Sequence, residues 1–334
     1  MAADSTIHKA SLLARIIYAV AHLLTPRLVR RIVLRSGQGP APAQFVEMGR
    51  RTNRLARLQR LRPFFGIRFA RESADGVPVE VVRRKDCHAP FGDGVILYFH
   101  GGGFITGGLD THLHVVATLA RRTRLPIVHV DYRQYPAVRV DGSVDDCVSA
   151  YRWLLEQGAD PAKTVIAGDS AGGFLAFATT LCGQQRGLPA PAGVVGISAL
   201  LELDGVARSS HANLHADAFG IPLVLPDIID QVCPSPAMRE ELSAISGPLD
   251  LMPPVLLIVG DSEILRCDAE RLCDALHHQG RHCDLQIWEN QLHAFPALFP
   301  LLRDSRAAYA AITDFVADRL ADSGRTGQIR RDVS

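Results

Sequence analysis

A single serine stands between glycines in the stretch VIAGDSAGGF, residues 165–174, which matches the pattern GxSxG. The apolar, β-branched residues before it are typical of a strand, and AGGFLAFATTL after it is typical of a helix. A strand, a sharp turn and a helix raise a serine oxygen above a sheet, and the glycines let strand and helix approach closely. This context predicts that Ser170 is a nucleophile.

A glycine-rich loop, HGGGF at residues 100–104, directly follows the apolar run VILYF. Three consecutive glycines leave backbone N–H groups unshielded, and such donors form an oxyanion hole when they face the charge that develops on an acyl oxygen. A phosphate loop would need GKS, GKT or a helix-opening GxGxxG, and the stretch has none of these. His100 is expected to make structural hydrogen bonds in this loop.

A serine hydroxyl is a poor nucleophile near neutral pH, so it needs an imidazole within hydrogen-bond reach. His293, in NQLHAF, follows the last predicted strand and precedes the C-terminal helix, which is the position expected for this base. Two histidines follow the glycine loop too closely to be the base, and three lie at the polar end of a predicted helix, where they are expected on the surface and a metal site is a weak alternative. These five are His112, His114, His277, His278 and His282.

The third member of such a site is a carboxylate on the loop after PVLLIVG, residues 254–260. Asp268 is expected to be the N-cap of the next helix, a structural role. Asp261 follows the strand immediately and is expected to point back into the turn. Glu263 is therefore the favoured acid, with Asp261 as the alternative.

The elements around these residues alternate. A β-hairpin is predicted around SADG at 73–76, and helix-like segments separate the later strands, the clearest at 143–158, with Val144, Val148 and Tyr151 on one face. This order predicts a mostly parallel sheet with helices on both faces. Residues 203–250 lack a strand pattern and are interpreted as a cap over the carboxyl edge of the sheet. The other predicted strands are 95–99, 126–132, 164–168, 192–198, 254–260 and 283–288.

The N-terminal segment has a different character. Residues 10–62 follow a helical pattern that Pro26 is expected to break, and residues 1–62 contain 12 Lys and Arg but only Asp4 and Glu47 as acids. The favoured interpretation is a solvated helix face, or one docked on the acidic remainder of the chain. Contact with an anionic membrane is the alternative. No aromatic residue interleaves with the arginines at 50–62, so nucleic acid is not an expected partner.

The cysteines bear on the compartment. The 334 residues contain seven cysteines, an odd number with no CxxC pair, which favours a reducing compartment over a disulfide framework. The apolar run IIYAVAHLL is too short to span a bilayer, and Arg15 interrupts what would be a signal-peptide core. The expected location is cytoplasmic, with membrane association left open.

HGGGF, GDSAGG and LHAF occur in this order, and over about residues 90–320 the chain resembles the hormone-sensitive-lipase-like group of α/β-hydrolases, its bacterial esterases especially. The resemblance implies a helical cap formed by residues 1–62 and the insertion at about 203–250, on a catalytic domain spanning 63–334. It also implies that the N–H groups of Gly102, Gly103 and Ala171 form the oxyanion hole, and it places Glu263 at the acid position.

The resemblance implies a serine carboxylesterase that forms an acyl-enzyme, acts on small esters of short to medium acyl chain, and needs no metal or organic cofactor. A lipase or amide hydrolase in peripheral membrane contact, and a non-catalytic binding scaffold, are the alternatives. A sheet edge near the C-terminus is expected to be exposed and available for a homodimer. The chain departs from the family at Glu263-Ile264, where Asp-Pro is usual, and at DYRQYPA, which lacks a customary glutamate.

Overall fold

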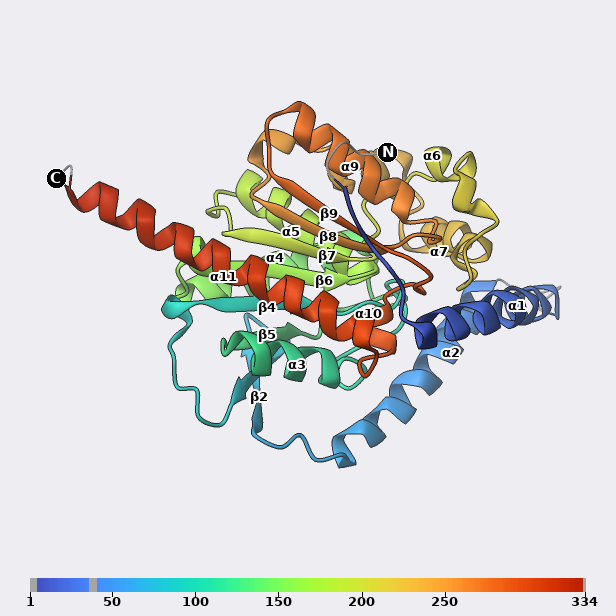
Figure 1. Ribbon diagram of the computed structural model, residues 1–334, viewed down its shortest axis with the longest axis horizontal. Helices are drawn as coiled ribbons and strands as arrows, with labels where there is room; N and C mark the ends of the chain where they lie inside the picture. Colours follow the sequence, from blue (N-terminus) through green and yellow to red (C-terminus); the bar gives the residue numbers. More distant parts are fainter. Residues whose placement is uncertain (1–4, 36–40, 333–334) are drawn as a thin grey trace.

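The computed structural model describes the backbone of residues 5–35 and 41–332, and the side chains of residues 5–25 and 46–322. The described residues form one nine-stranded sheet with the order β1-β9-β8-β7-β6-β4-β5-β3-β2 (Figure 1). The strands are β1 (Ser5–His8), β2 (Ile67–Ala74), β3 (Val77–Arg84), β4 (Val95–Phe99), β5 (Ile127–Val130), β6 (Thr164–Asp169), β7 (Gly193–Ile197), β8 (Val255–Gly260) and β9 (Cys283–Trp288).

The mostly parallel sheet predicted from the sequence is confirmed. Among the described strands, β3 alone runs opposite to the others, so it pairs antiparallel with both β2 and β5, and β2 and β3 form the predicted hairpin. The central strands β4, β6, β7 and β8 are buried along their whole length. Strands covered on both faces need continuous apolar runs, which is why VILYF and VLLIVG show no polar alternation.

Helices cover both faces of the sheet, because alternate residues of each strand point to opposite sides. On β4, Ile96 and Tyr98 belong to one core, whereas Leu97 and Phe99 belong to the other. In Figure 1, α11 crosses the sheet in front, beside α3. The first face packs against α3 (Leu113–Thr123), α10 (Phe295–Leu298) and α11 (Arg303–Asp332), and the second against α4 (Val140–Glu156), α5 (Ala171–Gln185) and α9 (Arg266–His278).

Between β7 and β8 the chain leaves the sheet. Residues 203–250, all of which the structure describes, contain short helices and turns and no strand, as the sequence predicts. The segment packs into the core through buried residues such as Ile229 and Val232. Its elements are α6 (Val206–Ser209), η4 (Ala212–Leu214), η5 (Ile221–Leu223), α7 (Leu225–Val232), α8 (Pro236–Leu242), η6 (Ala244–Ser246) and η7 (Leu249–Leu251).

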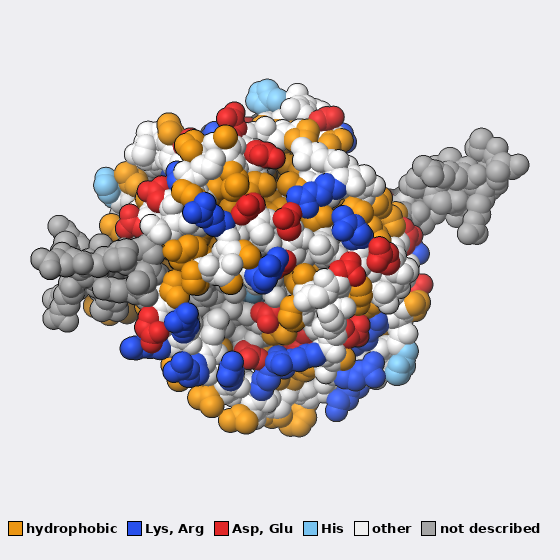
Figure 2. All heavy atoms as spheres, turned by 180° about the vertical axis from the view of Figure 1, so that it is seen from behind, with side chains coloured by type: hydrophobic (Ala, Val, Ile, Leu, Met, Phe, Trp, Pro, Cys, Tyr) orange, Lys and Arg blue, Asp and Glu red, His pale blue; other side chains and the backbone are white. Residues whose placement is uncertain are grey.

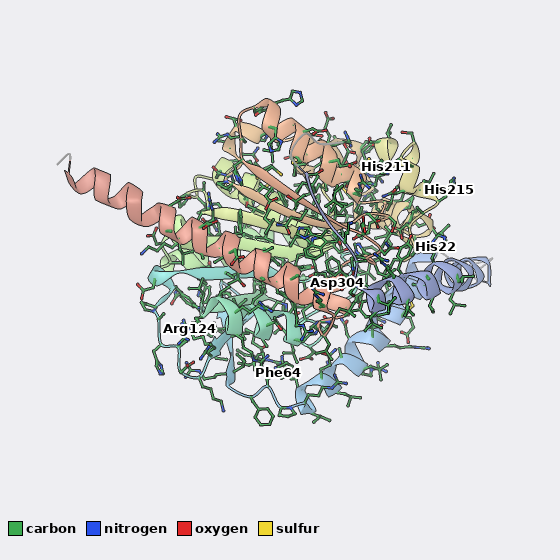
Figure 3. The ribbon with its side chains drawn as sticks, in the orientation of Figure 1. His22, Phe64, Arg124, His211, His215 and Asp304 are labelled. Atoms are coloured by element: carbon green, nitrogen blue, oxygen red, sulfur yellow. The ribbon has the colours of Figure 1, made fainter. Side chains whose placement is uncertain are left out.

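The N-terminal segment contains α1 (Leu12–Arg35), α2 (Ala41–Ala56) and the 3₁₀ helix η1 (Arg57–Leu61). The expected break at Pro26 is wrong, since α1 continues to Arg35. Proline removes one backbone donor, but strong helix formers such as Leu and Arg surround it. The start of α1 is fixed to α11, because Ser11 donates from its backbone N (2.9 Å) and its Oγ (2.5 Å) to Asp304 (Figure 3).

Strand β1 was not predicted, because four residues with two exposed side chains carry no readable periodicity. It pairs in parallel with β9, and the His8 imidazole stacks on Trp288 with 4.0 Å between ring centroids. The expectation of an exposed edge at the C-terminal strand is therefore wrong: β1 covers β9 and itself forms the edge. In the described part of the chain, no helix is long and apolar enough to cross a membrane.

Candidate active site

Four segments that carry the predicted site residues meet at the carboxyl edge of the sheet. The glycine loop follows β4 and Ser170 follows β6, while Glu263 and His293 come after β8 and β9. Parallel strands end at the same edge, so residues far apart in the sequence are brought together there.

Ser170 occupies a sharp turn with φ 54° and ψ −119°, a backbone conformation that residues other than glycine rarely adopt. The turn requires its glycines. A Cβ at Gly168 would lie 2.2 Å from the carbonyl oxygen of Gly172, and a Cβ at Gly172 would lie 2.1 Å from that of Phe99. The strand and the helix can approach this closely because neither glycine has a side chain, and the hydroxyl is held above the sheet.

The structure brings Ser170, His293 and Glu263 together in one hydrogen-bond chain. His293 Nε2 lies 2.8 Å from Ser170 Oγ, and His293 Nδ1 lies 2.8 Å from Glu263 Oε2. Both His293 and Glu263 are buried, whereas Ser170 is partly exposed. The imidazole is therefore placed to take a proton from the serine, with a carboxylate on its far side.

The carboxylate of Glu263 is held through its other oxygen. Oε1 accepts hydrogen bonds from the backbone N of Gly260 (2.6 Å) and from Ser198 Oγ (2.8 Å). Ser198 Oγ also accepts from the backbone N of Ala294, at 2.9 Å. Ser198 is not among the predicted site residues, although its position directly after β7, at the edge where the motifs converge, indicates such a role.

Electrostatics favour the charged form of His293. Burial alone would lower the pKa of this imidazole, but the hydrogen bond and negative charge of Glu263, together with the charges of Asp217 and Asp169, raise the pKa above its ordinary value. A base with a raised pKa holds the serine proton more firmly once it has taken it.

The other two acids lie elsewhere. The carboxylate of Asp261 accepts from the backbone N of Asn290 at 2.9 Å, so this side chain joins the turn after β8 to the loop after β9. The N-cap prediction for Asp268 is wrong, because α9 begins at Arg266 and Asp268 lies inside it, fully buried. It pairs with Arg208 Nη1 at 2.6 Å.

The predicted oxyanion donors lie beside the serine turn. Ala171 is the first residue of α5, so its N–H has no intrahelical acceptor. Gly102 and Gly103 have φ of 131° and 62°, and no protein acceptor for their N–H groups is found among the described residues. Three backbone donors are thus available near Ser170.

A buried aspartate ties this loop to the serine turn. Asp169 Oδ1 accepts from Tyr98 Oη (2.6 Å) and from the backbone N of Gly101 (3.1 Å), and Oδ2 lies 3.2 Å from His112 Nε2. Burial opposes ionisation of Asp169, but His112 and the Tyr98 hydrogen bond outweigh it and hold the pKa of this carboxyl well below its usual range. Neither Asp169 nor His112 has this role among the predictions from the sequence.

His100 is a structural residue, as predicted. It is fully buried, its Nδ1 lies 2.9 Å from the carbonyl oxygen of Gly101, and its ring stacks on Tyr132 at 4.4 Å. Burial, with the charge of His112, lowers the pKa of His100 to about 3, so the ring is neutral. Of the three late histidines, His278 and His282 are exposed. His277 corrects the expectation of a surface position, because it is partly buried and lies 2.9 Å from the carbonyl oxygen of Cys283.

The insertion at 203–250 contacts the acid loop. Asn213 Nδ2 donates to the backbone oxygens of Asp261 and Glu263, both at 2.8 Å, and Asp217 Oδ2 accepts from the backbone N of Ile264 at 3.0 Å. The Phe219 ring lies 5.6 Å from that of His293. The insertion therefore holds the loop that carries Glu263, and it places an aromatic ring beside His293.

A mostly parallel sheet with a serine, a histidine and an acidic residue hydrogen-bonded at its carboxyl edge defines the class of α/β-hydrolases. The family model described as alpha/beta hydrolase fold matches residues 96–297. The chain belongs to this family, within the hormone-sensitive-lipase-like group that the motifs predict.

Individual relatives agree with this placement. The carboxylesterase/phospholipase LipF of Mycobacterium tuberculosis is 33% identical over 256 residues, covering 73% of this chain and 67% of its own length. The esterase LipU of the same species is 32% identical over 231 residues, covering 67% and 77%. The crystal structure of EstE5 soaked with p-nitrophenyl butyrate has a TM-score of 0.77 and 25% identity, covering 93% of this chain and all of its own.

Proposed function

We propose that this protein is a serine carboxylesterase with the catalytic triad Ser170, His293 and Glu263. Ser170 Oγ attacks the ester carbonyl carbon while His293 Nε2 takes its proton, and this proton then passes to the departing alcohol. Water attacks the acyl-enzyme in the second half, giving a proton to His293, which returns it to Ser170 as the acid leaves. The continuous hydrogen-bond chain, 2.8 Å at each link, carries this proposal.

The oxyanion that forms in each half of the reaction needs donors. We propose that the N–H groups of Gly102, Gly103 and Ala171 bind it, and that Glu263 stabilises the positive charge on the imidazole. Each backbone donor of this kind is typically worth about 3 kcal/mol in the transition state. These steps use groups of this chain only, and the proposal includes no metal or organic cofactor.

The proposed substrates are esters with a short to medium acyl chain. Phe219 beside His293 narrows the site on one side, which favours compact acyl groups. The related EstE5 was soaked with p-nitrophenyl butyrate, an ester of this length, for its crystal structure. Rates for p-nitrophenyl acetate, butyrate, octanoate and palmitate test this: kcat/KM should peak at the butyrate or octanoate, and a maximum at palmitate would contradict it. The matching butyryl anilide tests amide hydrolysis, which should be far slower.

A lipid-directed esterase in peripheral membrane contact is the second candidate function. Most of the exposed large hydrophobic side chains in the described residues belong to the N-terminal segment, including Met48, Leu55, Leu58 and Leu61 on and after α2. Phe65, just after the segment, is also exposed. Figure 2 shows basic side chains along the lower edge of the molecule with hydrophobic ones beside them. Arg50, Arg54, Arg57 and Arg62 are exposed in the same stretch. A mixed basic and apolar surface fits an anionic bilayer, and the relative LipF is named a carboxylesterase/phospholipase.

Sedimentation with vesicles of phosphatidylcholine and phosphatidylserine tests this contact. Replacing Leu58 and Leu61 by serine should lower the bound fraction, whereas Leu301→Ser, which changes an 88% exposed leucine elsewhere, should not. Equal binding of both variants, or no binding of the unaltered protein, would exclude the surface as a membrane contact.

The proposed esterase consists of a catalytic domain and a cap. We propose that residues 1–62 and 203–250 form the cap on the catalytic domain, 63–334.

A cytoplasmic location is supported by seven cysteines that are all free thiols. A homodimer, if formed through the sheet, would use the edge strand β1; size-exclusion chromatography with light scattering tests it. The non-catalytic alternative predicts no labelling of Ser170 by an organophosphonate.

A further inference from the structure

Helix α2 places one polar side chain against the segment that follows the oxyanion glycines. Asn53 Nδ2 donates to the carbonyl oxygen of Gly107 at 2.9 Å, and Asn53 Oδ1 accepts from the backbone N of Gly107 and from Thr106 Oγ1, both at 3.0 Å. A single amide thus satisfies three polar groups of residues 106 and 107, as a neighbouring strand would do.

Helix α2 can lie close enough for Asn53 to reach residues 106 and 107 because Gly49, one turn before Asn53, has no side chain. A Cβ at Gly49 would lie 2.8 Å from Thr106 Cβ, so only glycine permits the approach. Residues four apart share a helix face, and Gly49 and Asn53 together form the face that docks on the loop. Thr106 Oγ1 also lies 3.3 Å from the carbonyl oxygen of Gly49.

Thr106 in turn fixes the peptide between the two oxyanion glycines. The backbone N of Thr106 donates to the carbonyl oxygen of Gly102 at 3.0 Å, and the backbone N of Ile105 donates to the same oxygen at 3.2 Å. The carbonyl of Gly102 and the N–H of Gly103 belong to one planar trans unit, so they point in opposite directions. Holding the carbonyl toward Thr106 therefore directs the Gly103 N–H away from it.

A second anchor fixes the same segment a few residues later. Arg60 in η1 forms an ion pair with Glu80 on β3 at 2.9 Å, and it also bonds Asp110, which follows the loop. Glu80 is buried, so this pair attaches η1 to the sheet itself. The N-terminal segment is thus held beside this loop at two points: by Asn53 on residues 106 and 107, and by Arg60 on Glu80 and Asp110.

We propose that Asn53 is a positioning residue for the oxyanion hole: through Thr106 and Gly107 it holds the Gly102–Gly103 peptide in the orientation that offers the Gly103 N–H to the substrate oxygen. This proposal rests on the proposed esterase function. A donor that acts on the charge developed in the transition state contributes to kcat, whereas a donor that binds substrate and transition state equally contributes to KM. Loss of Asn53 should accordingly affect kcat.

The experiment compares Asn53→Ala with Thr52→Ala, using p-nitrophenyl butyrate. Thr52 is exposed on the same helix, and its hydroxyl bonds only the helix's own backbone oxygen at Met48. Asn53→Ala should lower kcat by about tenfold with little change in KM, less than the hundredfold or greater loss typical when a donor is removed outright. Affinity for a trifluoromethyl ketone, which forms an oxyanion adduct with the serine, should fall in parallel. Thr52→Ala should match the unaltered protein in both measurements.

A second variant keeps the proposal testable if Asn53→Ala folds poorly. Thr106→Val retains the backbone and removes the hydroxyl that bonds Asn53. It should lower kcat by a smaller factor, and the double variant should lose less than the product of the two single effects, because both changes break one connection. Additive effects, an unchanged kcat, or a rise in KM with no loss of ketone affinity would overturn the proposal. An unaltered protein without esterase activity would instead refute the proposed function.

Discussion

Ser198 Oγ donates a hydrogen bond to Glu263 Oε1 at 2.8 Å and accepts one from the backbone N of Ala294 at 2.9 Å. This hydroxyl therefore joins the proposed acid to the residue that follows the proposed base. It also accounts for a glutamate as the proposed acid, at a position where the resemblance to the hormone-sensitive-lipase-like group implies that aspartate is usual. The longer side chain presents one oxygen to His293 and keeps the other on two fixed donors, Ser198 and Gly260.

Removing this hydroxyl should impair the reaction. Ser198→Ala leaves a buried carboxylate oxygen with one donor fewer, at a cost of about 1–3 kcal/mol. We expect kcat to fall by roughly tenfold or more and the melting temperature to fall with it. Ser210→Ala is the control, because that hydroxyl is exposed and bonds only the nearby carbonyl of Ala207. Equal activity of both variants would show that Ser198 does not act through Glu263.

The assignment of the acid is tested by two isosteric changes. Glu263→Gln removes the charge that faces His293, and kcat should fall by about 10³–10⁴, as in other serine hydrolases of this arrangement. Asp261→Asn changes a side chain that braces the turn through Asn290, so kcat should stay within a few-fold of the unaltered value. The opposite ranking would assign the role to Asp261.

The pH dependence follows from the environment of His293. The imidazole must be neutral to take the serine proton, and its pKa is raised above 6.5 because Glu263 and other acids outweigh burial. The acid limb of kcat/KM in the free enzyme should therefore fall as pH drops through a pKa above 6.5. In Glu263→Gln the two largest contributions that raise the pKa of His293, the hydrogen bond and the charge of Glu263, are lost, while burial and the smaller effects of Asp217 and Asp169 remain. The acid limb should therefore move to lower pH. A limb that stays in place, or moves upward, would contradict this electrostatic account.

The buried ion pair between Arg208 and Asp268 should be a stability determinant. Both side chains are nearly inaccessible, with 5% and 0% of their area exposed, and the pair joins the insertion to α9. Arg208→Ala leaves an unpaired buried carboxylate, which costs about 3–5 kcal/mol. The midpoint of urea unfolding should drop, while replacement of Arg281, an exposed arginine in the turn after α9, by alanine should leave it unchanged. A change below about 1 kcal/mol would mean that water reaches Asp268.

The sequence predicted much of this architecture, because its signals are local. Apolar runs such as VILYF indicate buried strands. GDSAGG and HGGGF indicate tight backbone turns that residues other than glycine cannot form. Each of the two motifs, and His293, directly follows a predicted strand. Because the carboxyl ends of parallel strands lie at one edge of the sheet, the sequence predicts that these residues meet there. The geometry of the turn at Ser170 follows from the same glycines.

The remaining features depend on contacts between distant segments. Asn53 and Gly107 are 54 positions apart, and Ser198 and Glu263 are 65 apart. Neither pair belongs to a motif, so nothing local indicates that they meet. Strand β1 is defined by its pairing with β9, which its own four residues do not indicate. The prediction of Asp268 as a helix cap is wrong because its true partner, Arg208, belongs to the insertion, and the sequence does not show how the insertion packs on α9.

Activation of Ser170 as a nucleophile by His293 can be measured as the gain in intact mass after treatment with a fluorophosphonate. The unaltered protein should gain the mass of one phosphonyl group on Ser170 and lose its activity toward p-nitrophenyl butyrate, and His293→Ala should react far more slowly. Ser170→Ala should gain no mass and hydrolyse no ester. Labelling at another residue, or ester hydrolysis by Ser170→Ala, would contradict this role of Ser170.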